Sequence, residues 1–249
     1  MSYEIVATSS TPALIIYLID ISASMSEKLD GTTKIKHVNQ AIANILQEMV
    51  YRSTRGEIVS PRYRLGMFAY SEKALDMLGK IETISDVVKK GTPELSSLTE
   101  TNTHAAFTKA RELLQSEMPR LGGKPAPMIC HLTDGQYTGN DPEPIAREIM
   151  QMANDDGNVL IENIYVGSDL TKKAIKDIES WSGVQNEDEL KSDYAKKLFR
   201  MSSPLPESYS QVLEQSGYSI AAGSRMLIPC HSRELIELAF TMSGATKTA

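Results

Sequence analysis

An uninterrupted apolar run from Ala13 to Ile19 is the feature that most constrains the fold of this chain. A strand with one solvated face alternates apolar and polar residues, whereas a continuous apolar run is typical of a strand buried on both faces. Such strands occur in parallel sheets that helices cover on both sides. The run ends at Asp20. We therefore expect a central strand of an α/β domain with Asp20 at its carboxyl end.

Apolar runs and segments of helical periodicity alternate along the rest of the chain. Strands are predicted at 63–70, 128–132, 159–166 and 198–201, with an antiparallel edge segment at 74–84. Helices are predicted where apolar residues recur every three or four positions, at 35–49, 107–119, 141–152, 174–178, 206–217 and 235–242. This order predicts a doubly wound α/β fold, in which helices cover both faces of a mostly parallel central sheet with one antiparallel edge strand.

The length of 249 residues suits one large domain, and no linker divides the chain. We expect an N-terminal extension at 1–12, the α/β domain at 13–218, and a C-terminal appendage with an amphipathic helix at 219–249. The polar and charged stretch at 181–197 is interpreted as a surface excursion.

Charge and composition narrow the classes of partner. The formal net charge of -6 argues against nucleic acid, because binding a phosphate backbone needs a basic patch. No apolar stretch approaches the roughly 20 residues of a membrane-spanning helix, and the first residues lack the features of a signal peptide. Two cysteines, Cys130 and Cys230, give no disulfide framework. We expect a cytoplasmic protein with neither nucleic-acid nor membrane partners.

Three polar clusters lie at the ends of predicted strands or the beginnings of predicted helices: Asp20 to Ser24, Thr99 to Thr103, and Thr133 to Gly135. In an open α/β sheet, ligands bind in the crevice outside the carboxyl ends of the strands. The clusters should therefore meet at one edge of the sheet. They offer carboxylate and hydroxyl oxygens, which are the ligands of a hard cation such as Mg²⁺.

These clusters, Asp-x-Ser-x-Ser, Thr-x-Thr and Leu-Thr-Asp-Gly, resemble in their order the metal ion-dependent adhesion site of the von Willebrand factor A family. The resemblance covers 13–201 by element order and implies a Rossmann-like fold. It also implies that Ser22, Ser24 and Thr101 coordinate a metal, with Asp20 and Asp134 close by, directly or through water. Thr99 and Thr103 remain alternatives to Thr101. Two positions depart from the family, since Ala23 replaces a common glycine and His104 a small residue.

The expected cofactor is Mg²⁺, with Mn²⁺ as the alternative. A site with two carboxylates and several neutral hydroxyls leaves coordination positions for an external anion. The resemblance implies that an Asp or Glu side chain of a partner protein occupies one of them. Among members of the family, the chain is similar to short cytosolic bacterial proteins associated with tellurium resistance and with kinase and phosphatase partners.

Other functions and simpler interpretations compete with this hypothesis. Ser22 and Ser24 would serve equally well to cap a turn, and Cys130-His131 and Cys230-His231 lack the Cys-x-x-Cys spacing of a zinc site. A Mg²⁺-dependent phosphoryl hydrolase would use Asp20 as a nucleophile, but Ser22 stands where that class needs a second carboxylate. No catalysis is expected. A metal with a purely structural role is the remaining alternative.

Overall fold

The computed structural model describes residues 3–247 and has a seven-stranded sheet at its centre. The strands run in the order β11-β10-β9-β1-β6-β7, and β8 also pairs with β6. Their bounds are β1 Ala13–Asp20, β6 Tyr63–Tyr70, β7 Ala74–Asp76, β8 Glu82–Thr83, β9 Met128–Thr133, β10 Leu160–Val166 and β11 Leu227–Cys230. All pairs are parallel except those of β7 and β8 with β6. The predicted mostly parallel sheet with an antiparallel edge is confirmed.

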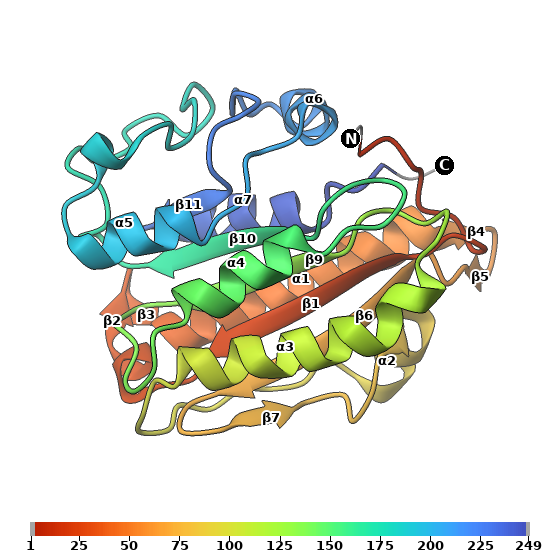
Figure 1. Ribbon diagram of the computed structural model, residues 1–249, viewed down its shortest axis with the longest axis horizontal. Coiled ribbons are helices and arrows are strands. Elements are labelled where there is room, and N and C mark those ends of the chain that lie inside the picture. The colour runs from red at the N-terminus through yellow and green to blue at the C-terminus, as the bar shows by residue number, and fades with distance from the viewer. Residues whose placement is uncertain (1–2, 248–249) are drawn as a thin grey trace.

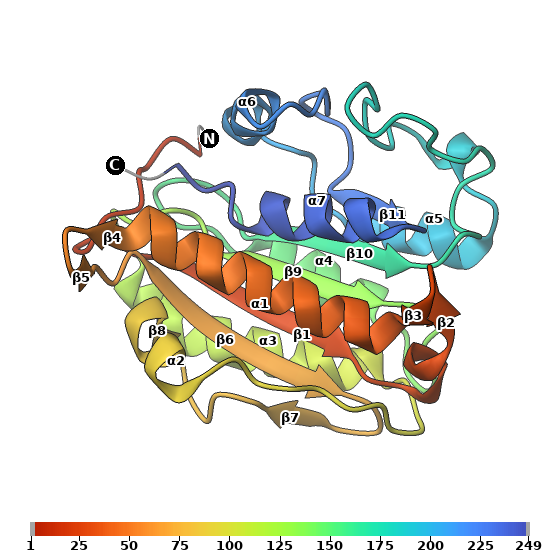
Figure 2. The same cartoon turned by 180° about the vertical axis from the view of Figure 1, so that it is seen from behind.

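Helices cover both faces of this sheet. They are α1 Lys34–Ser53, α2 Ile84–Lys90, α3 Thr103–Glu117, α4 Glu143–Gln151, α5 Asp193–Arg200, α6 Glu207–Gln215 and α7 Arg233–Ser243. Figure 1 shows α3 and α4 in front of the sheet, and Figure 2 shows α1, α2 and α7 on the opposite face. Short 3-10 helices span η1 Ala23–Ser26, η2 Met118–Arg120 and η3 Glu187–Glu189. Two small hairpins pair β2 Lys28–Leu29 with β3 Thr32–Thr33, and β4 Thr54–Arg55 with β5 Ile58–Val59.

Strand β1 explains why its sequence is apolar without alternation. Ile15 and Tyr17 belong to the core cluster beneath α1 and α7, whereas Leu14 and Ile16 belong to the cluster beneath α3 and α4. Every residue of the strand is buried. The strand therefore contributes to two cores at once, as expected for a central strand of a doubly wound sheet.

The predicted strand at 198–201 is wrong, because these residues end or follow helix α5. Ser192 caps this helix by accepting a hydrogen bond from the backbone N–H of Ala195, 3.0 Å away. Its buried side chains, Ala195, Leu198 and Phe199, have helical spacing. The prediction failed because a short apolar run fits a strand and a buried helical turn equally well. The predicted helix at 174–178 is also wrong, since these residues form no helix.

The last strand of the sheet is β11, which lies in the segment expected to be an appendage. It pairs in parallel with β10, and α7 packs against both β11 and α1. The Tyr17 and Ser243 hydroxyls lie 2.9 Å apart in a buried hydrogen bond between β1 and α7. The expected boundary at residue 218 therefore cuts through the sheet, and 219–249 is not an appendage over its described part.

The two ends of the described chain lie side by side (Figure 1). The backbone N–H of Ala7 donates to the carbonyl of Lys247 at 2.7 Å, and the Lys247 ammonium is paired with Glu4. Both ends lie near the start of β1, away from the carboxyl ends of the parallel strands. Among the helices of residues 3–247, none is long and apolar enough to span a membrane.

Candidate metal centre

Asp20 ends β1 and is fully buried. One carboxylate oxygen accepts a hydrogen bond from the backbone N–H of Ser22 at 2.8 Å, and the other accepts from the Thr133 hydroxyl at 2.9 Å. Burial raises the pKa of Asp20 to about 6, although the hydrogen bonds from Ser22 and Thr133 oppose this rise. Asp20 is thus an oriented carboxylate whose charge is only partly compensated.

The two serines after Asp20 connect it to the loop after β9. The hydroxyl oxygens of Ser22 and Ser24 lie 3.0 Å apart, and the Ser24 hydroxyl donates to a carboxylate oxygen of Asp134 at 2.7 Å. Ser22 precedes η1, yet its side chain makes no capping hydrogen bond. The two hydroxyls therefore point toward one another and toward Asp134. The Ser22 side chain does not cap η1.

Lys34 pairs with Asp134, a contact that the sequence analysis missed. Its ammonium lies 2.8 Å from Asp134 and 2.8 Å from Glu27, and the Asp134 side chain is 0% exposed. Burial lowers the pKa of Lys34, but the hydrogen bonds to both carboxylates outweigh burial, so the pKa is raised. The available signal was the position of Lys34 at the first residue of α1, where the helix dipole disfavours a cation.

Backbone hydrogen bonds tie the Thr99 to Thr103 loop to the other two clusters. The N–H of Leu98 donates to the carbonyl of Ile21 at 2.5 Å, and the N–H of Thr138 donates to the carbonyl of Thr101 at 2.7 Å. The three sequence clusters therefore meet at one edge of the sheet. Asp20, Ser22, Ser24 and Asp134 form a connected polar group there.

The hydroxyls of Thr99, Thr101 and Thr103 are not joined to this group by hydrogen bonds in the described part of the chain. Thr99 is exposed and Thr101 is half-buried. Thr103, the first residue of α3, is 1% exposed, and its hydroxyl has no hydrogen-bond partner among the described residues. Thr101 and Thr103 both stay candidates for a metal ligand on this geometry, whereas the exposure of Thr99 disfavours it.

The donor set fits a hard divalent cation. Among residues 3–247, no three His, Cys, Asp or Glu side chains form a group that could hold a metal, so hydroxyls must supply much of any coordination. Serine and threonine oxygens beside carboxylates suit Mg²⁺ or Mn²⁺ better than a softer metal. The Lys34 ammonium balances part of the Asp134 charge, but it is shared with Glu27, so a cation at the site would compensate the remaining negative charge.

Of the residues weighed as zinc ligands, Cys130, Cys230 and His131 are buried in the core, whereas His231 is half-buried. Cys130 and Cys230 are free and buried. His131 is buried between the Tyr70 hydroxyl at 2.7 Å and the Asn163 side-chain oxygen at 2.6 Å, and burial lowers its pKa to about 4. The Nδ1 atom of His104 lies 3.1 Å from the carbonyl oxygen of Asp141.

A small cavity of about 260 Å³ opens beside Asp134. Tyr165 and Asp169, which share a hydrogen bond of 2.7 Å, form part of its wall. Gln136 and Tyr194 also line it. A ligand bound at the polar group would therefore have a hydroxyl- and amide-bearing recess next to it.

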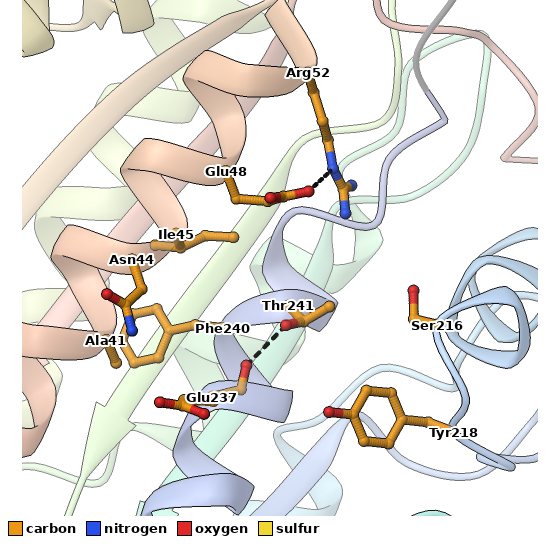
Figure 3. Close-up of a pocket in the computed structure, with 10 residues that line it drawn as sticks. All are labelled: Ala41, Asn44, Ile45, Glu48, Arg52, Ser216, Tyr218, Glu237, Phe240 and Thr241. Carbon is orange, nitrogen blue, oxygen red and sulfur yellow. Dashed lines mark hydrogen bonds and ion pairs between the residues drawn. The ribbon is translucent and has the colours of Figure 1, made fainter.

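A separate pocket of about 410 Å³ lies between α1, α7 and the segment after α6 (Figure 3). Its lining mixes apolar and charged groups, including Phe240 and the Glu48–Arg52 ion pair of 2.8 Å. Tyr218 closes the side opposite α1. None of the residues of the polar group lines this pocket.

Comparison with known proteins agrees with this geometry. Residues 15–136, which carry all three clusters, match the model of the von Willebrand factor type A domain. No curated protein sequence matches the chain.

Two solved structures are similar in fold. The pilus adhesin SpaC from Lactobacillus rhamnosus GG superposes with a TM-score of 0.62 and 11% identity, over 95% of this chain and 31% of SpaC. Proximal thread matrix protein 1 from the mussel byssus, with zinc in its metal ion-dependent adhesion site, gives a TM-score of 0.52 and 15% identity, over 94% of this chain and 47% of its own. The chain thus spans less than half of either. Residues 15–136 thus match the von Willebrand factor type A domain, and the fold around them is similar to that of the two structures.

Proposed function

We propose that the protein is a metal-dependent protein-binding module rather than an enzyme. The observation that carries this proposal is the polar group of Asp20, Ser22, Ser24 and Asp134 at the carboxyl edge of the sheet. Carboxylate and hydroxyl oxygens are held there within hydrogen-bond distance of one another. Their arrangement supports the binding of one cation at an edge that a partner can reach.

Asp20, Ser22, Ser24, Thr101 and Asp134 would hold Mg²⁺ or Mn²⁺. When bound, the metal supplies a positive centre that an Asp or Glu side chain of a partner can approach. The chain's own residues orient this centre: Thr133 fixes the Asp20 carboxylate, and Lys34 fixes that of Asp134. The cavity beside Asp134 would then contact the residues next to the partner's acidic side chain. A kinase or phosphatase as this partner, and a cytoplasmic location, remain predictions from the sequence.

A binding role is favoured over phosphoryl hydrolysis by what surrounds Asp20. Both of its carboxylate oxygens accept hydrogen bonds from the chain, which reduces their availability as a nucleophile. The neighbouring position expected to carry a second carboxylate holds Ser22. The remaining functional groups of the edge are hydroxyls and a lysine that is already paired.

The metal site is tested by calorimetric titration of Mg²⁺ and of Mn²⁺. The wild type is compared with the variant carrying Asp20→Ala and Ser22→Ala. Ser26→Ala is the matched control, because Ser26 ends η1 close to Ser24, is exposed, and its hydroxyl donates to no described group other than the Ala23 carbonyl. We expect metal binding by the wild type and by the control but not by the double variant. Equal binding by all three proteins, with folding verified by circular dichroism, would refute the site.

Partner recognition is tested by selecting peptides from a displayed random library in Mg²⁺ and eluting them with a chelator. The proposal expects eluted peptides enriched in Asp or Glu, and no enrichment on the double variant. If the wild type binds the metal but the selected peptides withstand the chelator, the metal is structural and the binding proposal is wrong.

A further inference from the structure

Three arginines from separate elements line one pocket. Two of them belong to α4 and α5, which lie side by side (Figure 1). The pocket has a volume of about 280 Å³ and is lined by Arg147, Met150, Gln151, Arg200 and Arg225. Arg147 belongs to α4, Arg200 ends α5, and Arg225 precedes β11. No acidic side chain lines the pocket. The pocket is separate from the metal centre. The last residues of α4 lie near the amino ends of the parallel strands, whereas Asp134 follows the carboxyl end of β9.

The carboxylates around this pocket balance two of the three arginines. Glu143 pairs with Arg147 at 2.7 Å and with Arg200 at 2.9 Å. Arg200 also pairs with Glu187 at 3.4 Å. Arg225 makes no salt bridge with any of the described residues. One positive charge at the pocket therefore has no carboxylate partner.

Arg225 is nevertheless held firmly in place. Its guanidinium donates to the carbonyl of Ser202 at 3.0 Å and stacks over the Phe199 ring, 4.9 Å from the ring centroid. Burial lowers the pKa of Arg225 and the charge of Arg147 lowers it further, whereas the charge of Glu187, which makes no salt bridge with Arg225, opposes this in part. Arg200 lies in the last turn of α5, where the helix dipole favours a cation, whereas Arg225 lies on neither α4 nor α5. An oriented, partly buried cation beside a like charge is typical of an anion site.

We propose that this pocket binds a phosphate group. Guanidinium groups approach it from three elements, and a tetrahedral phosphate offers terminal oxygens in more directions than a planar carboxylate does. Arg225 uses one terminal nitrogen for Ser202, which leaves its other N–H groups for a ligand. Arg147 uses its Nε and one terminal nitrogen for Glu143, which leaves the second terminal nitrogen. The Gln151 amide completes the donor set.

The proposal is tested with two phosphate sources in a buffer that contains a chelator, so that the metal centre does not contribute. The probes are inorganic phosphate and a pentapeptide with phosphoserine between alanines. Acetate and the unphosphorylated peptide are the controls. Binding is followed by the NMR signals of the arginine Nε–H groups and by calorimetry. We expect at least one phosphate source to bind and to shift the Arg225 signal, whereas acetate and the plain peptide do not.

Variants decide whether the pocket is responsible. Arg147→Gln and Arg225→Gln should each weaken phosphate binding about tenfold or more, since each removes charge-assisted hydrogen bonds. Arg233→Gln is the matched control, because Arg233 is a half-exposed arginine in an i, i+4 pair with Glu237, as Arg147 is with Glu143. It should bind phosphate as the wild type does. Binding of neither source, or equal affinity in all four proteins, would overturn the proposal. A preference for the peptide over inorganic phosphate would identify a phosphorylated protein as the source.

Discussion

At the scale of single residues, the pairing of Lys34 with Asp134 sets the charge of the metal centre. The Asp134 side chain is 0% exposed, so its charge would be costly without the ammonium 2.8 Å away. Lys34 also holds Glu27, which joins the loop before α1 to the same group. A bound metal and Lys34 would therefore both compensate the negative charge of the Asp134 carboxylate.

Replacing Lys34 should make the protein less stable and more responsive to metal. We expect Lys34→Met to lower the free energy of unfolding by about 3 kcal/mol without metal, because Asp134 is left buried and unpaired. Saturating Mg²⁺ should raise its melting temperature more than that of the wild type. The control is Lys36→Met, which changes an exposed lysine two residues further along. Equal metal-induced shifts in the two variants would show that Lys34 does not influence the site.

Glu162 is a buried acidic residue that lies in the core, away from the metal centre. It is opposite Cys130 in the register of β10 and β9, and it is 0% exposed. Neither carboxylate oxygen has a hydrogen-bond partner among the described residues. Burial raises the pKa of Glu162 well above its ordinary value, so the folded protein favours the protonated form of this residue.

The raised pKa of Glu162 predicts a loss of stability with rising pH. Unfolding exposes the carboxyl group, whose ordinary pKa is 4.5, so the folded state binds more protons above that pH. The contribution of Glu162 is fully present below pH 4.5 and is lost as pH rises toward the folded-state pKa. Urea unfolding of Glu162→Gln should show an advantage over the wild type that grows as pH rises above 4.5, by up to about 1.4 kcal/mol per pH unit, until the folded-state pKa is passed. The exposed Glu57→Gln should show no such growth, and a pH-independent difference for Glu162→Gln would contradict the argument.

At the scale of elements, β11 and α7 complete the sheet and one of its two cores. β11 covers the edge of β10, and α7 buries a row of apolar side chains against the sheet and α1. The buried residues of this row are Leu235, Ile236, Leu238, Ala239, Phe240 and Met242. Without these side chains, the core beneath α7 would be exposed to solvent.

A chain that ends at residue 218 should therefore fail to fold cooperatively. It lacks β11 and α7, and it leaves Tyr17 of β1 without the contact to Ser243. Thermal melts followed by circular dichroism, together with limited proteolysis, check this expectation. The full chain is the reference. A single cooperative melt of the shortened chain would mean that 219–249 is dispensable after all.

Long elements were predictable from the sequence, and short ones were not. The double-faced strand β1 and the helical stripe of α1 each repeat one pattern over many residues. By contrast, α5 and β11 are brief, and four apolar residues such as those at 198–201 do not distinguish a strand from a helical turn.

The candidate site divides in the same way. Asp20, Ser22, Ser24 and Asp134 were predictable as a group, because parallel strands end at a common edge. The Lys34 contact depends on how the loop between η1 and α1 folds, which no local pattern encodes. The arginine pocket joins residues from three elements, so it appears only in three dimensions.

At the scale of the whole molecule, the metal centre links loops that follow β1 and β9 and one that precedes α3. Metal bound to the folded protein alone should therefore stabilise the entire domain. At a free metal concentration 100 times the dissociation constant, the expected gain is about 2.7 kcal/mol. Thermal melts over a series of Mg²⁺ concentrations should show a rising midpoint for the wild type and a constant one for the variant with Asp20→Ala and Ser22→Ala. A constant midpoint for the wild type, despite calorimetric binding, would mean that the metal binds folded and unfolded chains alike.

The adjacent ends of the chain have a practical consequence for binding measurements. The backbone N–H of Ala7 donates to the carbonyl of Lys247. This contact lies near the start of β1, at the end of the sheet opposite Asp20 and Asp134. A sensor surface or fluorescent label attached through either end would therefore lie far from the metal centre and leave it accessible to solvent. Either orientation of a fusion should present the same face to a soluble partner, so two oppositely tagged preparations provide an internal check on every affinity measured.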